Sequence, residues 1–182
     1  LLLVNFFLIT IISRVYGAEI YGEYASSKSL SVLIGTAIVM SLALVVTKFL
    51  AQKNESSKLM FQNAYTLILR NLMISFIILI PLTLFLKRDL PMTILFLIGF
   101  VFNEMIHVAL AYYQAKGDFV TSSKQIILRT IIYGLGAWIL VTQGFSILSL
   151  IMFQVITLVS FFVVAHFSIP KNDIDLNSNK SV

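Results

Sequence analysis

The chain has 182 residues, of which 59% are apolar and 12% are charged, and its formal net charge is +5. Soluble domains are nearer half apolar and a quarter charged, so too few charged side chains are present to cover a soluble core of this size. Apolar runs near the length of a membrane span recur along the chain, which predicts an all-α, polytopic transmembrane helical bundle. Cysteine is absent, which excludes disulfides and thiolate metal sites.

About six membrane helices are expected, and the first one is short. Residues 1–12 are apolar but too few to cross a hydrocarbon core of about 30 Å, so we interpret them as the end of a truncated first helix. Complete helices are predicted at 24–46, 63–86, 92–114, 125–142 and 145–167. Together these ranges form one transmembrane lobe, residues 1–167. The polar residues 168–182, with Pro170 as a helix stop, are expected to form a tail or an interrupted linker.

A polar turn is predicted between the first two helices, at residues 13–28. Gly17 and Gly22 permit backbone angles that suit a tight reversal, and the tyrosines of this stretch suit a membrane interface. The helix that follows begins with small residues, as close packing between helices requires. These are Ser26, Ser27, Ser29, Ser31, Gly35 and Ala37. We therefore interpret the stretch as a turn and a packing surface.

The basic residues predict the orientation of the bundle. Because successive helices alternate in direction, the loops fall into two sets. One set carries Arg14, Lys28, Lys87 and Arg88. The other carries Lys48, Lys53, Lys58, Lys116, Lys124, Lys171 and Lys180, with Arg70 and Arg129 just inside the adjoining helices. The positive-inside rule places the larger set in the cytoplasm, so the first turn faces outward and the tail lies in the cytoplasm.

Titratable residues cluster within the predicted helix 92–114. Glu104 lies midway between Met92 and Lys116, which puts it near the bilayer centre. A carboxylate at this depth costs roughly 2.5 kcal/mol or more unless it is protonated, paired or hydrated. Asn103 precedes it, and His107 follows on a neighbouring face of the helix. The cluster either holds helices together as a buried polar network or faces a cavity that binds coupling ions or sugar hydroxyls.

Arg70 and Arg129 are expected about 5 Å inside the cytoplasmic end of their helices. From there each either extends to the membrane surface or lines the mouth of a cavity, where a guanidinium can grip a pyrophosphate with two hydrogen bonds. Each belongs to a stripe of polar residues on its helix. The stripes contain Asn63, Thr66 and Arg70 on one helix, and Gln125, Arg129 and Tyr133 on the other.

The first turn also carries a family resemblance. Residues 13–51, SRVYGAEIYGEYASSKSLSVLIGTAIVMSLALVVTKFLA, resemble the region that joins the first two helices of polysaccharide repeat-unit flippases of the O-antigen translocase type. These belong to the multidrug, oligosaccharidyl-lipid and polysaccharide exporter superfamily. The matching parts are YGAEIYGEYA, the small-residue helix after it, and KFLA at the inner end of that helix. YYQAKGDF, residues 112–119, is similar to the end of the fourth helix in the family, and helix number and spacing agree across essentially the whole chain.

The resemblance implies one lobe of a two-lobe transporter in a bacterial inner (plasma) membrane. Such a flippase passes isoprenoid-pyrophosphate-linked oligosaccharides to the outer leaflet, for lipopolysaccharide and other surface polysaccharides, through a cationic lumen. The implied partners are this lipid-linked substrate, the bilayer, the missing second lobe or another copy of the chain, and polysaccharide assembly proteins. Because transporters built from repeats bind substrate at the repeat interface, one lobe alone should not transport.

Candidate substrate-binding residues are Arg70, Asn103, Glu104, His107 and Arg129. Two other functions stay open: a cation-coupled drug or organic-cation antiporter of the same superfamily, and a non-transporting membrane scaffold. Glu104 favours the antiporter, whereas a basic inner mouth argues against cationic cargo. No enzyme is expected, because thiol nucleophiles, metal-ligand spacing, phosphate-binding glycine loops and paired-carboxylate motifs are missing. Catalytic residues, metals, cofactors and nucleic-acid partners are likewise not expected.

Overall fold

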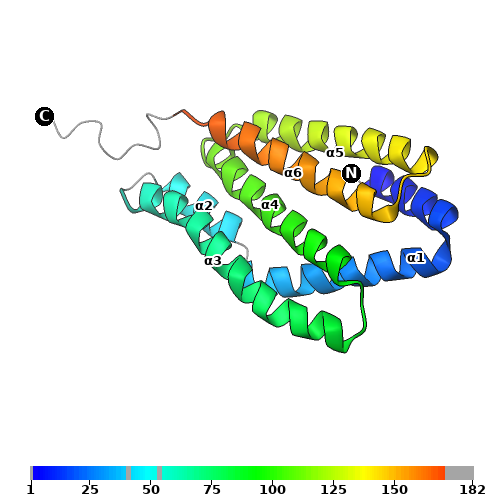
Figure 1. Ribbon diagram of the computed structural model, residues 1–182. Coiled ribbons are helices and arrows are strands. Elements are labelled where there is room, and N and C mark those ends of the chain that lie inside the picture. The colour runs from blue at the N-terminus through cyan, green and yellow to red at the C-terminus, as the bar shows by residue number, and fades with distance from the viewer. Residues whose placement is uncertain (1, 40–41, 53–54, 171–182) are drawn as a thin grey trace, which may run out of the picture.

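The computed structural model describes residues 2–39, 42–52 and 55–170, and within these ranges the chain is helical with short connections (Figure 1). The all-α fold class predicted from the sequence is confirmed. The described helices are α1 Leu2–Val39, α2 Leu42–Ala51, α3 Glu55–Phe85, α4 Leu90–Ala115, α5 Phe119–Thr142 and α6 Ile147–Phe167.

Four helical stretches of the described chain are long and apolar enough to cross a membrane. They are Asn63–Phe85 within α3, and the whole of α4, α5 and α6. The stretch Phe6–Ala37 and helix α2, which meet at an angle of 41°, make a fifth candidate when they are taken as one bent span. The protein is therefore a multi-pass membrane protein with four to five candidate spans.

Helix α1 consists of two helical segments that meet at Gly17. This residue has φ 85° and ψ 166°, a backbone conformation that side-chain-bearing residues rarely adopt. In Figure 1 the chain changes direction between these two blue segments. Before Gly17, Leu8 packs in a cluster with Ala137 of α5, and after it Ile34 packs with Leu79 of α3. The predicted reversal is therefore present, and a single glycine makes it.

The turn is shorter than the sequence analysis predicted. Helical structure resumes directly after Gly17, so residues 18–23 belong to α1, and Gly22 lies inside the helix instead of contributing to the reversal. The predicted helix 24–46 thus begins earlier and is divided between α1 and α2. The polar character of this stretch was misleading because polar side chains at a membrane surface do not by themselves end a helix.

Helices α3 and α5 also begin earlier than predicted, at Glu55 and Phe119 instead of residues 63 and 125. The additional residues of α3 precede its candidate span, which begins at Asn63, whereas those of α5 belong to its candidate span. Asp118 caps α5, because its Oδ1 accepts the N–H of Thr121 at 3.0 Å. Hydrogen bonds from the hydroxyl and backbone N–H of Thr121 hold the pKa of Asp118 below its usual range. Most of the predicted tail, residues 171–182, lies outside the described residues.

Three tight turns connect α3 to α4, α4 to α5 and α5 to α6, and each contains a residue with positive φ. Gly117 (φ 79°) ends α4 and Gly144 (φ 74°) ends α5. After Gly117 the N–H of Asp118 donates to the carbonyl of Tyr113 at 2.9 Å, the backbone pattern of a glycine-ended helix. After α3 the residue with positive φ is Lys87, whose φ is 51°. The short turns bring α4, α5 and α6 into mutual contact.

Helix α4 lies at the centre of the bundle (Figure 1). It contacts each of the other described helices. Of its apolar stretch 56% is buried inside the protein, against 22% for α3, 11% for α5 and 22% for α6. A polar side chain on α4 can therefore face other helices, whereas half of the positions on α5 are exposed.

The second segment of α1 packs closely on α4 through small residues. Ser27, Ser31 and Gly35 follow one another at one-turn spacing, and all three are buried. The hydroxyl of Ser31 donates to the carbonyl of Thr93 on α4 at 2.8 Å, and a Cβ at Gly35 would overlap the ring of Phe100. The predicted packing surface is thus confirmed at these three positions. The other small residues are half-buried or exposed: Ser26, Ser29 and Ala37.

Candidate functional site

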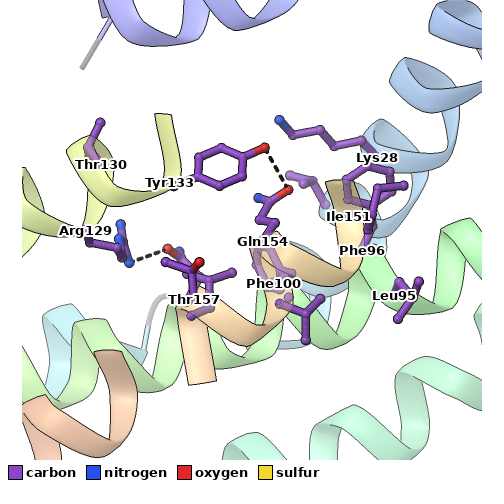
Figure 2. Close-up of a pocket in the computed structure, with 15 residues that line it drawn as sticks. Lys28, Leu95, Phe96, Phe100, Arg129, Thr130, Tyr133, Ile151, Gln154 and Thr157 are labelled. Atoms are coloured by element: carbon purple, nitrogen blue, oxygen red, sulfur yellow. Dashed lines mark hydrogen bonds between the residues drawn. The ribbon is translucent and has the colours of Figure 1, made fainter. Parts of the chain in front are cut away.

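A polar pocket of about 280 Å³ lies between α1, α4, α5 and α6 (Figure 2). Its volume is at the low end of the range for sites that bind small molecules. Aliphatic and aromatic side chains form part of the wall, among them Phe96 and Phe100 of α4. The polar lining consists of Lys28 from α1, Asn103 from α4, Arg129, Thr130 and Tyr133 from α5, and Gln154 and Thr157 from α6.

One hydrogen bond joins α5 to α4 at the pocket. Nη1 of Arg129 donates to Oδ1 of Asn103 at 3.0 Å, and both side chains are half-buried. The bond orients the guanidinium, which carries several further N–H donors. Since Asn103 is the partner found for Arg129 among the described residues, the remaining donors can serve a ligand in the pocket.

A second hydrogen bond joins α5 to α6 in the same pocket. The hydroxyl of Tyr133, one turn beyond Arg129, donates to Oε1 of Gln154 at 3.4 Å. The ring of Tyr133 stacks against Phe153, with ring centroids 6.4 Å apart. Figure 2 shows the side chain of Lys28 reaching from α1 toward the end of the pocket where Tyr133 and Gln154 lie. The pocket thus has one cation near each of its two hydrogen bonds.

The described lining is cationic. It contains Lys28, which is exposed on α1, and Arg129, which is half-buried on α5, but neither Asp nor Glu. The nearest carboxylate in this network belongs to Glu104, whose Oε1 accepts a long hydrogen bond of 3.5 Å from Nδ2 of Asn103. The amide of Asn103 thus stands between Arg129 and Glu104. An arrangement of two cations and several neutral polar groups favours an anionic ligand with hydroxyl groups.

The structure brings together some of the residues predicted for the site and separates others. Asn103 and Arg129 line the pocket. Glu104 is connected to it through Asn103, whereas His107 is half-buried on the same helix; neither is part of the lining. Arg70 is exposed on α3 and does not line the pocket.

Arg129 lies farther along its helix than the sequence analysis predicted. Because α5 begins at Phe119, Arg129 is about 15 Å from the start of the helix, near its middle. Arg70, in contrast, is about 10 Å from the start of the candidate span Asn63–Phe85. The predicted position at the inner mouth therefore describes Arg70 better than Arg129. The difference arises from the missed first turns of α5.

Sequence reasoning missed Lys28 and Gln154 as pocket residues. Lys28 was counted with the basic residues of the outer loops although it falls within the predicted helix 24–46, and the structure places it inside α1. Gln154 interrupts the apolar run of α6, and an isolated polar residue in a membrane span is itself a signal of a protein-facing position. Among the described residues, no group of three or more His, Asp or Glu side chains is placed to hold a metal ion.

Comparison with known proteins adds no family to this geometry. No protein-family model matches the chain, and neither a curated protein nor a solved structure does. The resemblance to polysaccharide flippases therefore rests on the residues quoted for it. The coarser conclusion stands on the fold: the chain is a helical, multi-pass membrane protein with four to five candidate spans and a cationic pocket between four of its helices.

Proposed function

We propose that the chain is one lobe of a bacterial inner-membrane transporter that moves an anionic, isoprenoid-pyrophosphate-linked oligosaccharide to the outer leaflet. The observation that carries the proposal is that Lys28 and Arg129 line the same pocket, whose described lining has no carboxylate. A guanidinium suits a pyrophosphate, which it can bind with two parallel hydrogen bonds. The amides and hydroxyls of Asn103, Tyr133 and Gln154 suit the hydroxyl groups of a sugar.

The free energy needed to place a cation inside a membrane span supports a functional role for the pocket. A cation in a membrane span costs roughly 2.5–3.5 kcal/mol at the helix centre, and such residues commonly mark substrate pathways. Arg129 is half-buried near the middle of α5, and Lys28 adds a second positive charge to the same lining. A network that only joined helices would not need either charge, since Asn103, Tyr133 and Gln154 could be satisfied by neutral partners.

The same pocket weighs against the two other functions. An antiporter for organic cations needs an acidic group facing its cargo, whereas Glu104 is separated from the pocket by Asn103. A scaffold protein has no need for a cationic cavity. In the proposed transporter the pocket is part of a site that a second lobe or another copy of the chain completes, and polysaccharide assembly proteins act beside it.

Binding of inorganic pyrophosphate tests the proposal. The chain is placed in nanodiscs of phosphatidylcholine and titrated by calorimetry. We expect binding that weakens with added salt, and Lys28→Gln or Arg129→Gln should weaken it roughly tenfold to hundredfold, since a charge-assisted hydrogen bond contributes about 1.5–3 kcal/mol. Lys124→Gln is the matched control, because Lys124 is an exposed cation of α5 outside the described pocket lining.

Two results would contradict the proposal. If pyrophosphate does not bind, or binds equally to all variants, the pocket is not an anion site. If the wild-type chain instead binds tetraphenylphosphonium, and Glu104→Gln abolishes that binding, the organic-cation antiporter becomes the better assignment.

A further inference from the structure

An apolar groove of about 350 Å³ lies beside the polar pocket, between the first segment of α1 and α5. Much of its lining is exposed, and the exposed fraction is 61% for Phe7, 58% for Leu135 and 52% for Trp138. In a membrane, such a surface contacts hydrocarbon. The large apolar residues of the lining are Phe7, Leu8, Ile11, Ile131, Leu135 and Trp138.

The groove and the polar pocket meet at one residue. Thr130 lines both cavities. On α5 it lies between Arg129, which lines the pocket, and Ile131, which lines the groove. Since consecutive residues of a helix point in different directions, α5 presents its cation to one cavity and its aliphatic side chains to the other. A charged site and an apolar channel are thus adjacent.

We infer that the groove holds the hydrocarbon chain of the anionic lipid whose pyrophosphate binds at Lys28 and Arg129. The inference rests on the function proposed for the pocket and adds the path of the lipid chain, which leaves the pocket past Thr130 and runs between α1 and α5. A lipid has a charged head and an apolar chain joined at one point, and the two cavities have the same arrangement. The described groove lining is free of charged side chains, as a hydrocarbon chain requires.

The groove should determine where the hydrocarbon chain lies more than how tightly the lipid binds. Lipid chains around the protein are as apolar as the groove, so the transfer of a chain into it gains little free energy from the hydrophobic effect. What the groove provides is a fixed location for the chain while the head occupies the pocket. A decisive experiment therefore has to report where the chain lies.

Photolabelling with a prenyl pyrophosphate that carries a diazirine on its hydrocarbon chain reports this location. The complete chain is labelled in phosphatidylcholine nanodiscs, and the crosslinked residues are identified by mass spectrometry. We expect labels at residues 7–11 and 131–138, and excess inorganic pyrophosphate should reduce them at least fivefold because the head anchors the chain. The same diazirine on a prenol without phosphate should label these residues weakly and should not be displaced.

A matched pair of variants tests the groove itself. Ile131→Trp fills it and should reduce labelling at residues 7–11 several-fold while leaving the binding of inorganic pyrophosphate unchanged. Ile132→Trp places the same bulk on the neighbouring exposed residue, which does not line the groove, and should label like the wild type. If Ile131→Trp does not fold, displacement by pyrophosphate in the wild-type chain decides the question alone.

The possible failures are distinguishable. If pyrophosphate binds in calorimetry but does not displace the label, the inference about the groove is overturned while the anion pocket stands. The same holds if the labels map to other residues. Absence of pyrophosphate binding would remove the proposed function together with the inference. If residues 7–11 take up no lipid label, and a photoreactive amino acid placed at residue 7 crosslinks to a second chain instead, another copy of the protein covers the groove and the inference is overturned as well.

Discussion

Helices α3 and α5 each carry one arginine in an apolar span, but the structure gives the two arginines opposite surroundings. Arg129 donates to Asn103 at 3.0 Å and lines a pocket that four helices form. Arg70 is exposed and lies about 10 Å into its candidate span, from where a long side chain can reach the membrane surface. A cation at the surface needs only length and charge, whereas one in a pocket needs a defined shape. The two arginines should therefore differ in their tolerance of lysine.

The largest expected effect comes from this exchange. Arg129→Lys keeps the charge but removes the planar pair of donors, so we expect pyrophosphate affinity to fall roughly tenfold to hundredfold. Arg70→Lys should leave it unchanged. Calorimetry of both variants in nanodiscs measures the difference, with the amount of folded protein checked by size-exclusion chromatography. Equal affinities for the two variants would show that the pocket does not depend on the guanidinium.

A second test concerns the close contact that forms one wall of the pocket. Gly35→Ala places a Cβ against the ring of Phe100, which lines the pocket, and should destabilise the protein by about 1–3 kcal/mol. Gly22→Ala is the matched control on the same segment, where a Cβ meets no atom within 4 Å. It should stabilise the helix by about 0.5–1 kcal/mol. Thermal unfolding in detergent gives both values, and similar melting temperatures for the two variants would mean that α1 and α4 are less tightly packed than described.

The smallest expected effect is the change in stability on substitution of Lys87, which follows α3, the helix that carries Arg70. Lys87 has φ 51°, which costs a residue with a Cβ about 1–2 kcal/mol. Lys87→Gly removes this cost but gives the unfolded chain more freedom, so we expect a net gain of about 0.5–1 kcal/mol in the free energy of unfolding. Pyrophosphate binding should not change. Arg88→Gly should instead lower stability slightly, because Arg88 is not among the residues with positive φ; a loss of stability in Lys87→Gly would contradict the assigned backbone conformation.

The sequence predicted the fold class well because membrane spans depend on local composition. The predicted helices 92–114 and 145–167 agree with α4 and α6 within two residues at each end, since long apolar runs fill both helices. The polar caps are Asp89 and Lys116 for α4, and Ser146 and Ser168 for α6. The starts of α3 and α5 were missed because serines and a lysine interrupt the apolar pattern in both additional segments. A cap such as Asp118 is the better signal there, and composition hides it.

The site was predicted only in part, because its contacts are not local. Arg129 and Asn103 were each singled out, but they are separated by 26 residues, and their hydrogen bond depends on how α5 lies against α4. Periodicity placed Arg70 and Arg129 in equivalent stripes and could not tell which stripe faces another helix. Lys28 was missed for a related reason, since its place in the pocket depends on the single-residue turn at Gly17.

The buried stripe of Ser27, Ser31 and Gly35 sets limits on how this protein can diverge. A larger side chain at any of these positions would push α1 away from α4, and with it one wall of the pocket, so substitutions there should be restricted to small residues. Leu33, which lies on the same segment and is 68% exposed, can exchange freely with other apolar residues. Distant relatives of the chain should therefore be recognisable by small residues at one-turn spacing after the first turn, even where the surrounding apolar sequence has changed completely.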